Sequence, residues 1–186
     1  MLAVASLLTS VLAPAIGDFV NGARLVKARS DMQVIAVGLT RFAFDVSLQR
    51  NTSGSWSGFD VLVGAGQTPA PGDTDASPWT AELSTGRAGQ LDDYLVRNQA
   101  GDERRTARFG GGMFSRGWAG PYLDAGVGPD PWGYRYAVSV RHLVDGSGWD
   151  AVVLSAGPDA IVETAFNSRA ASTDSGDLGC LLAPGY

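Results

Sequence analysis

The side chains that could carry out catalytic chemistry are few. His142 is the only histidine, and a serine or cysteine nucleophile activated by an imidazole base would depend on it. No G-x-S-x-G elbow, Walker loop or H-E-x-x-H motif accompanies it. Because His142 continues the alternation of the preceding residues, the sequence favours a satisfied core histidine or a histidine at a strand end over a general base.

Pairs of acidic residues offer a second kind of chemistry. Glycosidases hold two carboxyl groups at a fixed separation across a sugar cleft. Nothing in the sequence shows convergence of its acidic pairs, and acidic residues among glycines are typical of turns. We therefore do not expect an enzyme, although three pairs are present: Asp73 with Asp75, Asp92 with Asp93, and Asp174 with Asp177.

The segment 154–167 suits a metal ion better. Ca²⁺ takes carboxylate, amide and carbonyl oxygens, often from one irregular loop. The segment offers Asp159, Glu163 and Asn167 together with backbone carbonyls, among them that of Leu154. The EF-hand pattern is absent. A calcium loop and a turn with solvated acidic residues are both consistent with these residues.

Length and composition bound the kind of protein that carries these groups. The chain has 186 residues, which is enough for one domain with a real core, and its 45% hydrophobic content argues against disorder. One cysteine excludes a disulfide framework within the chain. A net charge of −5 argues against nucleic acid as a partner recognised through bulk charge.

The composition changes at about residue 50, which divides the chain into two parts. Residues 1–50 carry five basic and three acidic side chains, a net of +2, whereas residues 51–186 carry nine and sixteen, a net of −7. All five Trp and 22 of the 25 Gly lie in the second part. We expect a helical stalk over 1–50 and a globular head over 51–186.

The first part has the pattern of one long helix. Its apolar residues recur with spacings of three and four, which places them on a single face. A helix from Ile16 to Val46 would be about 45 Å long and would project beyond a small head. Pro14 would kink it by removing one backbone hydrogen bond. The face comprises Leu25, Ala28, Met32, Ile35, Leu39, Phe42 and Val46.

The head shows signals for a small sheet. Residues 132–140 alternate between apolar and polar side chains, and 150–155 form an apolar run after a Gly-rich turn, which together predict a β-hairpin. A short strand is expected over 59–63 and a second, shorter helix over 90–98.

Three features together resemble the major pseudopilin of type II secretion systems, within the type IV pilin-like superfamily. The first is the long helix with its embedded proline. The second is WAGPYL at 118–123, followed by DPWGYRY at 130–136. The third is VLSAGPD at 153–159, which is similar to the strand and loop where family members bind calcium. The match covers about residues 5–50 and 117–167.

The resemblance implies an α+β fold, in which a long N-terminal helix packs on a small antiparallel sheet as a pilin-like α/β roll. It implies a non-enzymatic filament subunit that assembles with itself, with other pseudopilins and with an inner-membrane secretion platform. The apolar helix face from Leu25 to Val46 would serve this assembly. The head would face the periplasm and the helix would lie in the inner membrane and the filament core. The basic leader of the family would precede Met1, and the uncharged residues 1–17 would be the rest of its anchor.

Two other functions stay open at this stage. A minor pseudopilin or pilin-type adhesin would gather Trp56, Trp79 and Phe114 at the outer tip of the head. A small secreted carbohydrate-binding or carbohydrate-active module would instead use residues 1–17 as a signal peptide, cleaved after Ala13 or Ala15.

Overall fold

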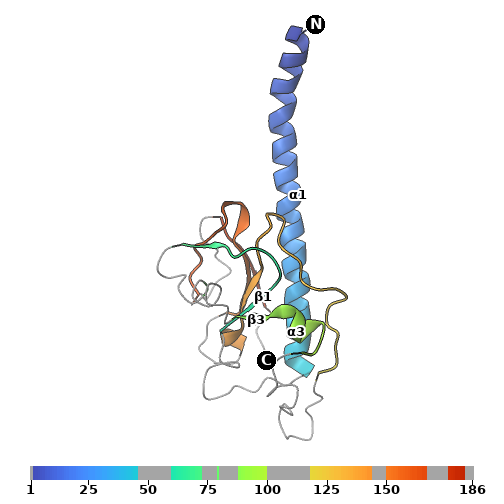
Figure 1. Cartoon of the computed structure of the whole chain (residues 1–186), viewed down its shortest axis with the longest axis vertical. Coiled ribbons are helices and arrows are strands. Elements are labelled where there is room, and N and C mark those ends of the chain that lie inside the picture. Colours follow the sequence, from blue (N-terminus) through green and yellow to red (C-terminus); the bar gives the residue numbers. More distant parts are fainter. Residues whose placement is uncertain are drawn as a thin grey trace, which may run out of the picture.

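The long N-terminal helix dominates the shape of the molecule. The computed structural model describes residues 2–45, 60–72, 79, 88–99, 118–143, 150–166 and 176–182. Helix α1 (Leu2–Asp45) is one continuous element of 44 residues that includes Pro14. The head lies beside the C-terminal half of α1, and the N-terminal half projects away from it (Figure 1). No helix among the described residues is both long and apolar enough to cross a membrane.

The predicted apolar face of α1 packs on the head of the same chain. Its members recur every three or four residues, so they line one side of the helix. Leu25 is half-buried, and Val46 lies outside the described residues. The buried members contribute to the core between α1 and the sheet: Ala28, Met32, Ile35, Leu39 and Phe42.

The head is built on a five-stranded sheet with the order β3-β1-β4-β5-β7. These strands are β1 (Val61–Val63), β3 (Gly89–Gln90), β4 (Ala137–Ser139), β5 (Val152–Ser155) and β7 (Leu178–Leu181). All neighbours are antiparallel except β1 and β3, which are parallel. The α+β class is therefore confirmed, but the sheet is mixed, whereas the resemblance implied an antiparallel one.

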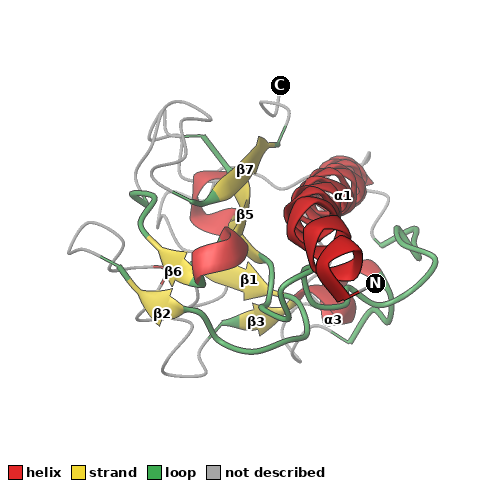
Figure 2. Ribbon diagram, turned by 90° about the horizontal axis from the view of Figure 1, so that it is seen from above, coloured by secondary structure: helices red, strands yellow, loops and turns green. Residues whose placement is uncertain are grey.

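Helix α1 lies on one side of the sheet and β2 (Ala70–Pro71) and β6 (Ile161–Val162) lie on the other (Figure 2), and buried residues line both faces. Leu62, Val138 and Val153 face α1. Their neighbours along the strands, such as Val61 and Leu154, face a second core that includes Trp79 and Phe166. On this far side β2 and β6 form a parallel pair.

The predicted hairpin is real but shorter than the alternation suggested. Gly133 has a φ of +96° and donates its N–H to the carbonyl of Asp130, so residues 130–133 form a turn instead of a strand. After β4 the chain enters a 3-10 helix, η2 (Val140–Leu143), which contains His142. The prediction of a strand over 132–140 was therefore wrong at both ends, whereas 150–155 contains β5.

The WAGPYL segment fastens the C-terminal end of α1 to the head. Helix α3 (Leu91–Leu95) is shorter than the predicted 90–98. The indole N–H of Trp118 donates to the Tyr94 carbonyl at 2.7 Å. The rings of Tyr94 and Tyr122 both meet Phe42 edge-on, with centroids 6.0 and 5.6 Å away. These contacts hold the helix at a fixed position on the head.

Candidate functional site

Two carboxylates meet where the loop after β5 approaches the C-terminal segment. A single 3-10 turn, η3 (Gly157–Asp159), follows β5, and its ends have the left-handed backbone of Gly157 (φ +65°) and Ala160 (φ +63°). Asp159 is exposed, and its Oδ1 accepts the Ile161 N–H at 3.2 Å. The turn therefore presents Asp159 at the surface beside the start of β6.

The second carboxylate, Asp177, comes from the chain just before β7. It is only 5% exposed, and its Oδ2 accepts the N–H groups of Glu163 at 2.9 Å and Thr164 at 2.7 Å. The Thr164 side chain also hydrogen-bonds to this carboxylate, whereas Oδ1 is buried and has no partner at ordinary hydrogen-bond geometry. A buried carboxylate oxygen without a protein partner is costly unless a cation or an ordered water binds it, so Oδ1 is a candidate ligand for a cation.

The two carboxylates are close enough to repel each other. A Cβ on Gly176 would lie 2.5 Å from Oδ2 of Asp159, so Asp159 rests against the residue that precedes Asp177. The pKa of Asp177 is raised, mainly because burial disfavours its charged form and in smaller part because Asp159 is negative. A divalent cation would offset both effects, which is the chemistry that suits this pair of side chains.

The predicted calcium ligands are distributed unevenly around this position. Asp159 is at the site, and Glu163 contributes its backbone N–H to Asp177. Leu154 lies in β5 between Ala137 of β4 and Gly179 of β7, so its backbone belongs to the sheet and not to a loop. Asn167 lies outside the described residues. The part of the chain that the structure describes contains no group of three or more His, Cys, Asp or Glu that could hold a metal ion.

Asp177 was not among the predicted ligands, although it was singled out as part of the acidic pair with Asp174. The sequence signal that could have identified Asp177 as a ligand is the Gly-Asp dipeptide that precedes the apolar run near the C-terminus. Its position beside Asp159 depends on β7 pairing with β5, which no local pattern shows.

Asp130, the first residue of the DPWG motif, is buried next to the end of β5 and stabilises the loop that carries Asp159. It is 3% exposed and accepts three hydrogen bonds, from the N–H groups of Trp132 and Tyr134 and from the Ser155 hydroxyl at 2.7 Å. The Ser155 oxygen in turn accepts the Gly157 N–H at 3.2 Å. Asp130 therefore links the turn before β4 to the loop that carries Asp159.

A second candidate surface lies on α1, opposite the buried face. Large apolar side chains follow it, and 18 residues make five full turns of an α-helix, so the spacings of 7, 11 and 7 keep them on one side. The predicted assembly residues lie on the other side, against the chain's own sheet. The exposed members of this surface are Phe19 (79%), Val26 (68%), Val37 (52%) and Phe44 (72%).

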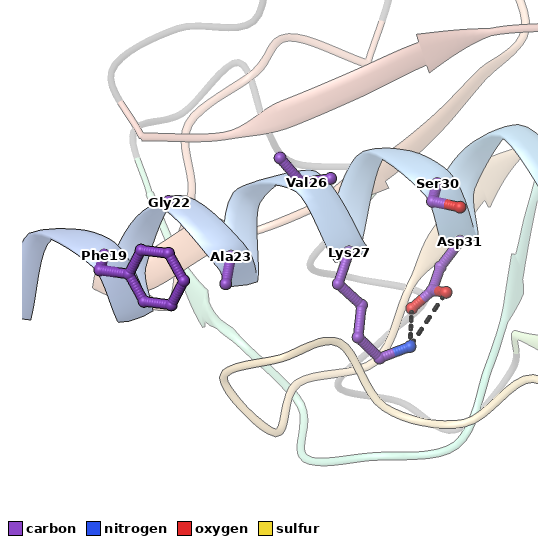
Figure 3. Close-up of a pocket in the computed structure, with 7 residues that line it drawn as sticks. All are labelled: Phe19, Gly22, Ala23, Val26, Lys27, Ser30 and Asp31. Atoms are coloured by element: carbon purple, nitrogen blue, oxygen red, sulfur yellow. Dashed lines mark hydrogen bonds and ion pairs between the residues drawn. The ribbon is translucent and has the colours of Figure 1, made fainter. Parts of the chain in front are cut away.

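A groove interrupts this exposed surface near the middle of α1 (Figure 3). Small residues form its floor, and a Cβ on Gly22 would meet nothing within 4 Å. The Lys27 ammonium and the Asp31 carboxylate form an ion pair of 2.9 Å at its C-terminal end. The lining residues are Phe19, Gly22, Ala23, Val26, Lys27, Ser30 and Asp31.

The aromatic cluster expected of an adhesin is not supported by Trp79, the one member of the cluster among the described residues. Trp79 is 1% exposed and packs edge-on against Phe166, with ring centroids 5.0 Å apart. Trp56 and Phe114 lie outside the described residues. Trp79 therefore serves the core on the far side of the sheet.

Comparison with known proteins identified no relative of the chain. No family model, curated protein or solved structure matches the chain. Function is therefore inferred from the residues and their geometry.

Proposed function

We propose that the chain is the subunit of a filament and assembles with other copies through the exposed face of α1. The observation that carries this proposal is the exposed side of α1: one side of its C-terminal half packs on the head, while Phe19 on the projecting half and Val26 just beyond the midpoint remain largely exposed. Burial of apolar surface releases roughly 25 cal/mol per Å². Contiguous exposed apolar surface of this kind is characteristic of interaction sites.

The geometry of the helix favours a filament over a closed dimer. A surface that runs along a projecting helix can contact a neighbour displaced along the same axis. Head-to-tail contacts of this kind do not close on themselves and continue as a helical array. The role of the subunit is then mechanical and needs no catalytic residue.

The resemblance of WAGPYL and DPWGYRY to pseudopilin segments extends this proposal to a type II secretion filament. In that setting the partners are other pseudopilins and the inner-membrane platform, and the head faces the periplasm. These assignments are supported by the sequence motifs only. Fractionation of the producing cells, followed by detection of the chain in membrane and soluble fractions, tests the location.

Assembly itself is tested by pelleting and electron microscopy of the purified full chain. Wild-type protein should form elongated particles that sediment with increasing concentration. Phe19→Ser should abolish them, because it places a polar side chain on the exposed face without touching the head. A wild-type chain that stays monomeric under all conditions would contradict the proposal.

We also propose that the head binds Ca²⁺ through Asp159 and Asp177. The support is the buried Oδ1 of Asp177, which lacks a partner, and the adjacent negative charge of Asp159. The ion would supply positive charge between the β5 loop and the segment before β7. Binding to the folded state alone raises stability by mass action, so the thermal midpoint should rise with added Ca²⁺ and fall with chelator.

A further inference from the structure

The groove on α1 has the form of a hole in knobs-into-holes packing. Four residues surround its centre: Phe19, Gly22, Ala23 and Val26, at positions i, i+3, i+4 and i+7. Four residues with this spacing are the set that surrounds one side chain of a facing helix. Because Gly22 and Ala23 are small, the hole between Phe19 and Val26 can accept a large side chain (Figure 3).

A matching side chain is present on the same face of α1. Phe44 is 72% exposed, and it follows Val26 by 18 residues, which is five full turns. Its neighbour Phe42 faces the head and is 2% exposed. Phe44 is therefore a large apolar group that the chain's own head does not cover.

We propose that Phe44 of one copy inserts into the hole formed by Phe19, Gly22, Ala23 and Val26 of a second, parallel copy. This inference rests on the proposed self-assembly and specifies its register. The two helices are then displaced by 21–22 residues, which is about 32 Å along the axis. Each copy offers one Phe44 and one hole at different heights, so the contact repeats from copy to copy.

The charges that flank the two features fit this register. Arg41 lies three residues before Phe44, and Asp18 lies one turn before Gly22 on the adjacent side of the helix. In the proposed register Arg41 of one copy is level with residues 19–20 of the other, within about 3 Å of the Asp18 level. Both side chains are exposed, and among the described residues no ion pair includes either one.

An antiparallel arrangement lacks this complementary pair. With the direction of one helix reversed, insertion of Phe44 would bring Arg41 to the level of residues 25–26, about 11 Å along the axis from Asp18. The side chain nearest to that level on the exposed face is Lys27, which already pairs with Asp31 and offers Arg41 no acidic partner. The parallel arrangement therefore has the better charge match, and it is the one that builds a continuous array.

Cysteine crosslinking in the full chain tests the register directly. In a Cys180→Ser background, with Phe44 and the hole intact, Arg41→Cys and Asp18→Cys variants should form a covalent dimer with a short thiol crosslinker when mixed, and neither should do so alone. Gly17→Cys in place of Asp18→Cys is the matched control, because Gly17 is also helical, exposed and unobstructed, but it lies on the side of α1 opposite the hole. Equal crosslinking at Gly17, or no crosslinking at Asp18 in a chain that assembles, would overturn the register.

Charge exchange gives a second readout that does not depend on added thiols. Asp18→Arg and Arg41→Asp should each weaken assembly by about two- to fivefold, the range of an exposed ion pair. The double exchange should restore it. Assembly that is unaffected by these variants would overturn the register while leaving the proposed function intact, whereas a wild-type chain that never assembles overturns both.

Discussion

The Tyr136 hydroxyl donates a 3.1 Å hydrogen bond to Oδ2 of Asp31 and so joins the head to α1 through a polar contact. The same carboxylate accepts hydrogen bonds from Lys27 at 2.9 and 3.1 Å. N-terminal to this group the helix is mostly exposed, and C-terminal to it one face is buried. Asp31 therefore marks the region where the helix separates from the head, and it limits how the two parts can rotate.

Loss of the Tyr136 hydroxyl should weaken this link and change the alkaline stability of the protein. Burial, followed by the negative charge of Asp31, raises the pKa of Tyr136 above its ordinary value of 10. A raised pKa stabilises the folded state below pH 10, and this contribution is lost as the pH rises further. Tyr136→Phe should cost about 1 kcal/mol at neutral pH and reduce the loss of stability above pH 10.

Urea unfolding at neutral and alkaline pH measures both effects. Tyr134→Phe is the matched control, because it removes a phenol from the same segment but not from this contact. An alkaline decline of the same size in wild type and Tyr136→Phe would contradict the assignment of that decline to Tyr136.

Two phenylalanines separated by one residue should respond in opposite ways. Phe42 is buried between α1 and the head, so Phe42→Ala should lower the free energy of unfolding by about 3–5 kcal/mol. Phe44 is exposed, so Phe44→Ala should change it by less than about 0.5 kcal/mol and act on assembly instead. Urea unfolding of both variants, with sedimentation of Phe44→Ala, checks this; a large loss of stability in Phe44→Ala would be incompatible with the account.

The calcium response should depend on Asp177 and on pH. Asp177→Asn keeps an oxygen that can accept the Glu163 and Thr164 N–H groups, but it removes the negative charge. The variant should therefore fold and show no rise in thermal midpoint with Ca²⁺. Asp159→Ala should also lose the rise, whereas the exposed residue Asp124, changed to Asn, should retain it.

The pH dependence follows from the raised pKa of Asp177. Without metal, ionisation of Asp177 destabilises the folded state, so stability should increase as the pH falls through its pKa towards 3.8. With Ca²⁺ present the ionised form is the one that binds, so the stabilisation by Ca²⁺ should disappear over the same range. Thermal melts with Ca²⁺ and with chelator across acidic pH separate the two; a response to Ca²⁺ that persists when Asp177 is protonated would exclude this residue as a ligand.

Asp130 should be among the most sensitive polar residues of the head. Its replacement by Ala leaves the N–H groups of Trp132 and Tyr134 without an acceptor and removes the partner of Ser155. Hydrogen bonds to a charged group contribute about 1.5–3 kcal/mol each, so a loss of at least ~3 kcal/mol is expected. A change in urea-unfolding free energy as small as that of Asp124→Ala would show that the network does not stabilise the head.

The elements that the sequence predicted well are those in which a pattern extends over many residues. The three- and four-residue spacing from Leu25 to Phe42 identifies both the helix and the face that packs, because many turns repeat the same signal. The apolar run at 150–155 similarly identified β5. The two-residue strands β2, β3 and β6 have no period to detect, and β3 makes the sheet mixed.

The candidate site was harder to predict from the sequence, for a different reason. Asp159 and Asp177 are brought together by strand pairing between β5 and β7, and a single sequence does not reveal such pairing. On α1, the sequence shows apolar residues on two opposite faces. Which face the head covers depends on the shape of the sheet, so the face ending in Phe42 was assigned to assembly although its own head occupies it.

The most direct test of the central claim is sedimentation velocity of the purified full chain over a wide range of concentrations, with wild type compared to Phe44→Ala and to Phe19→Ser. Wild type should shift continuously to larger species as the concentration increases, and both variants should remain monomeric with unchanged unfolding free energies. A wild-type chain that sediments as a monomer throughout, or variants that assemble as wild type does, would contradict assembly through the exposed face of α1.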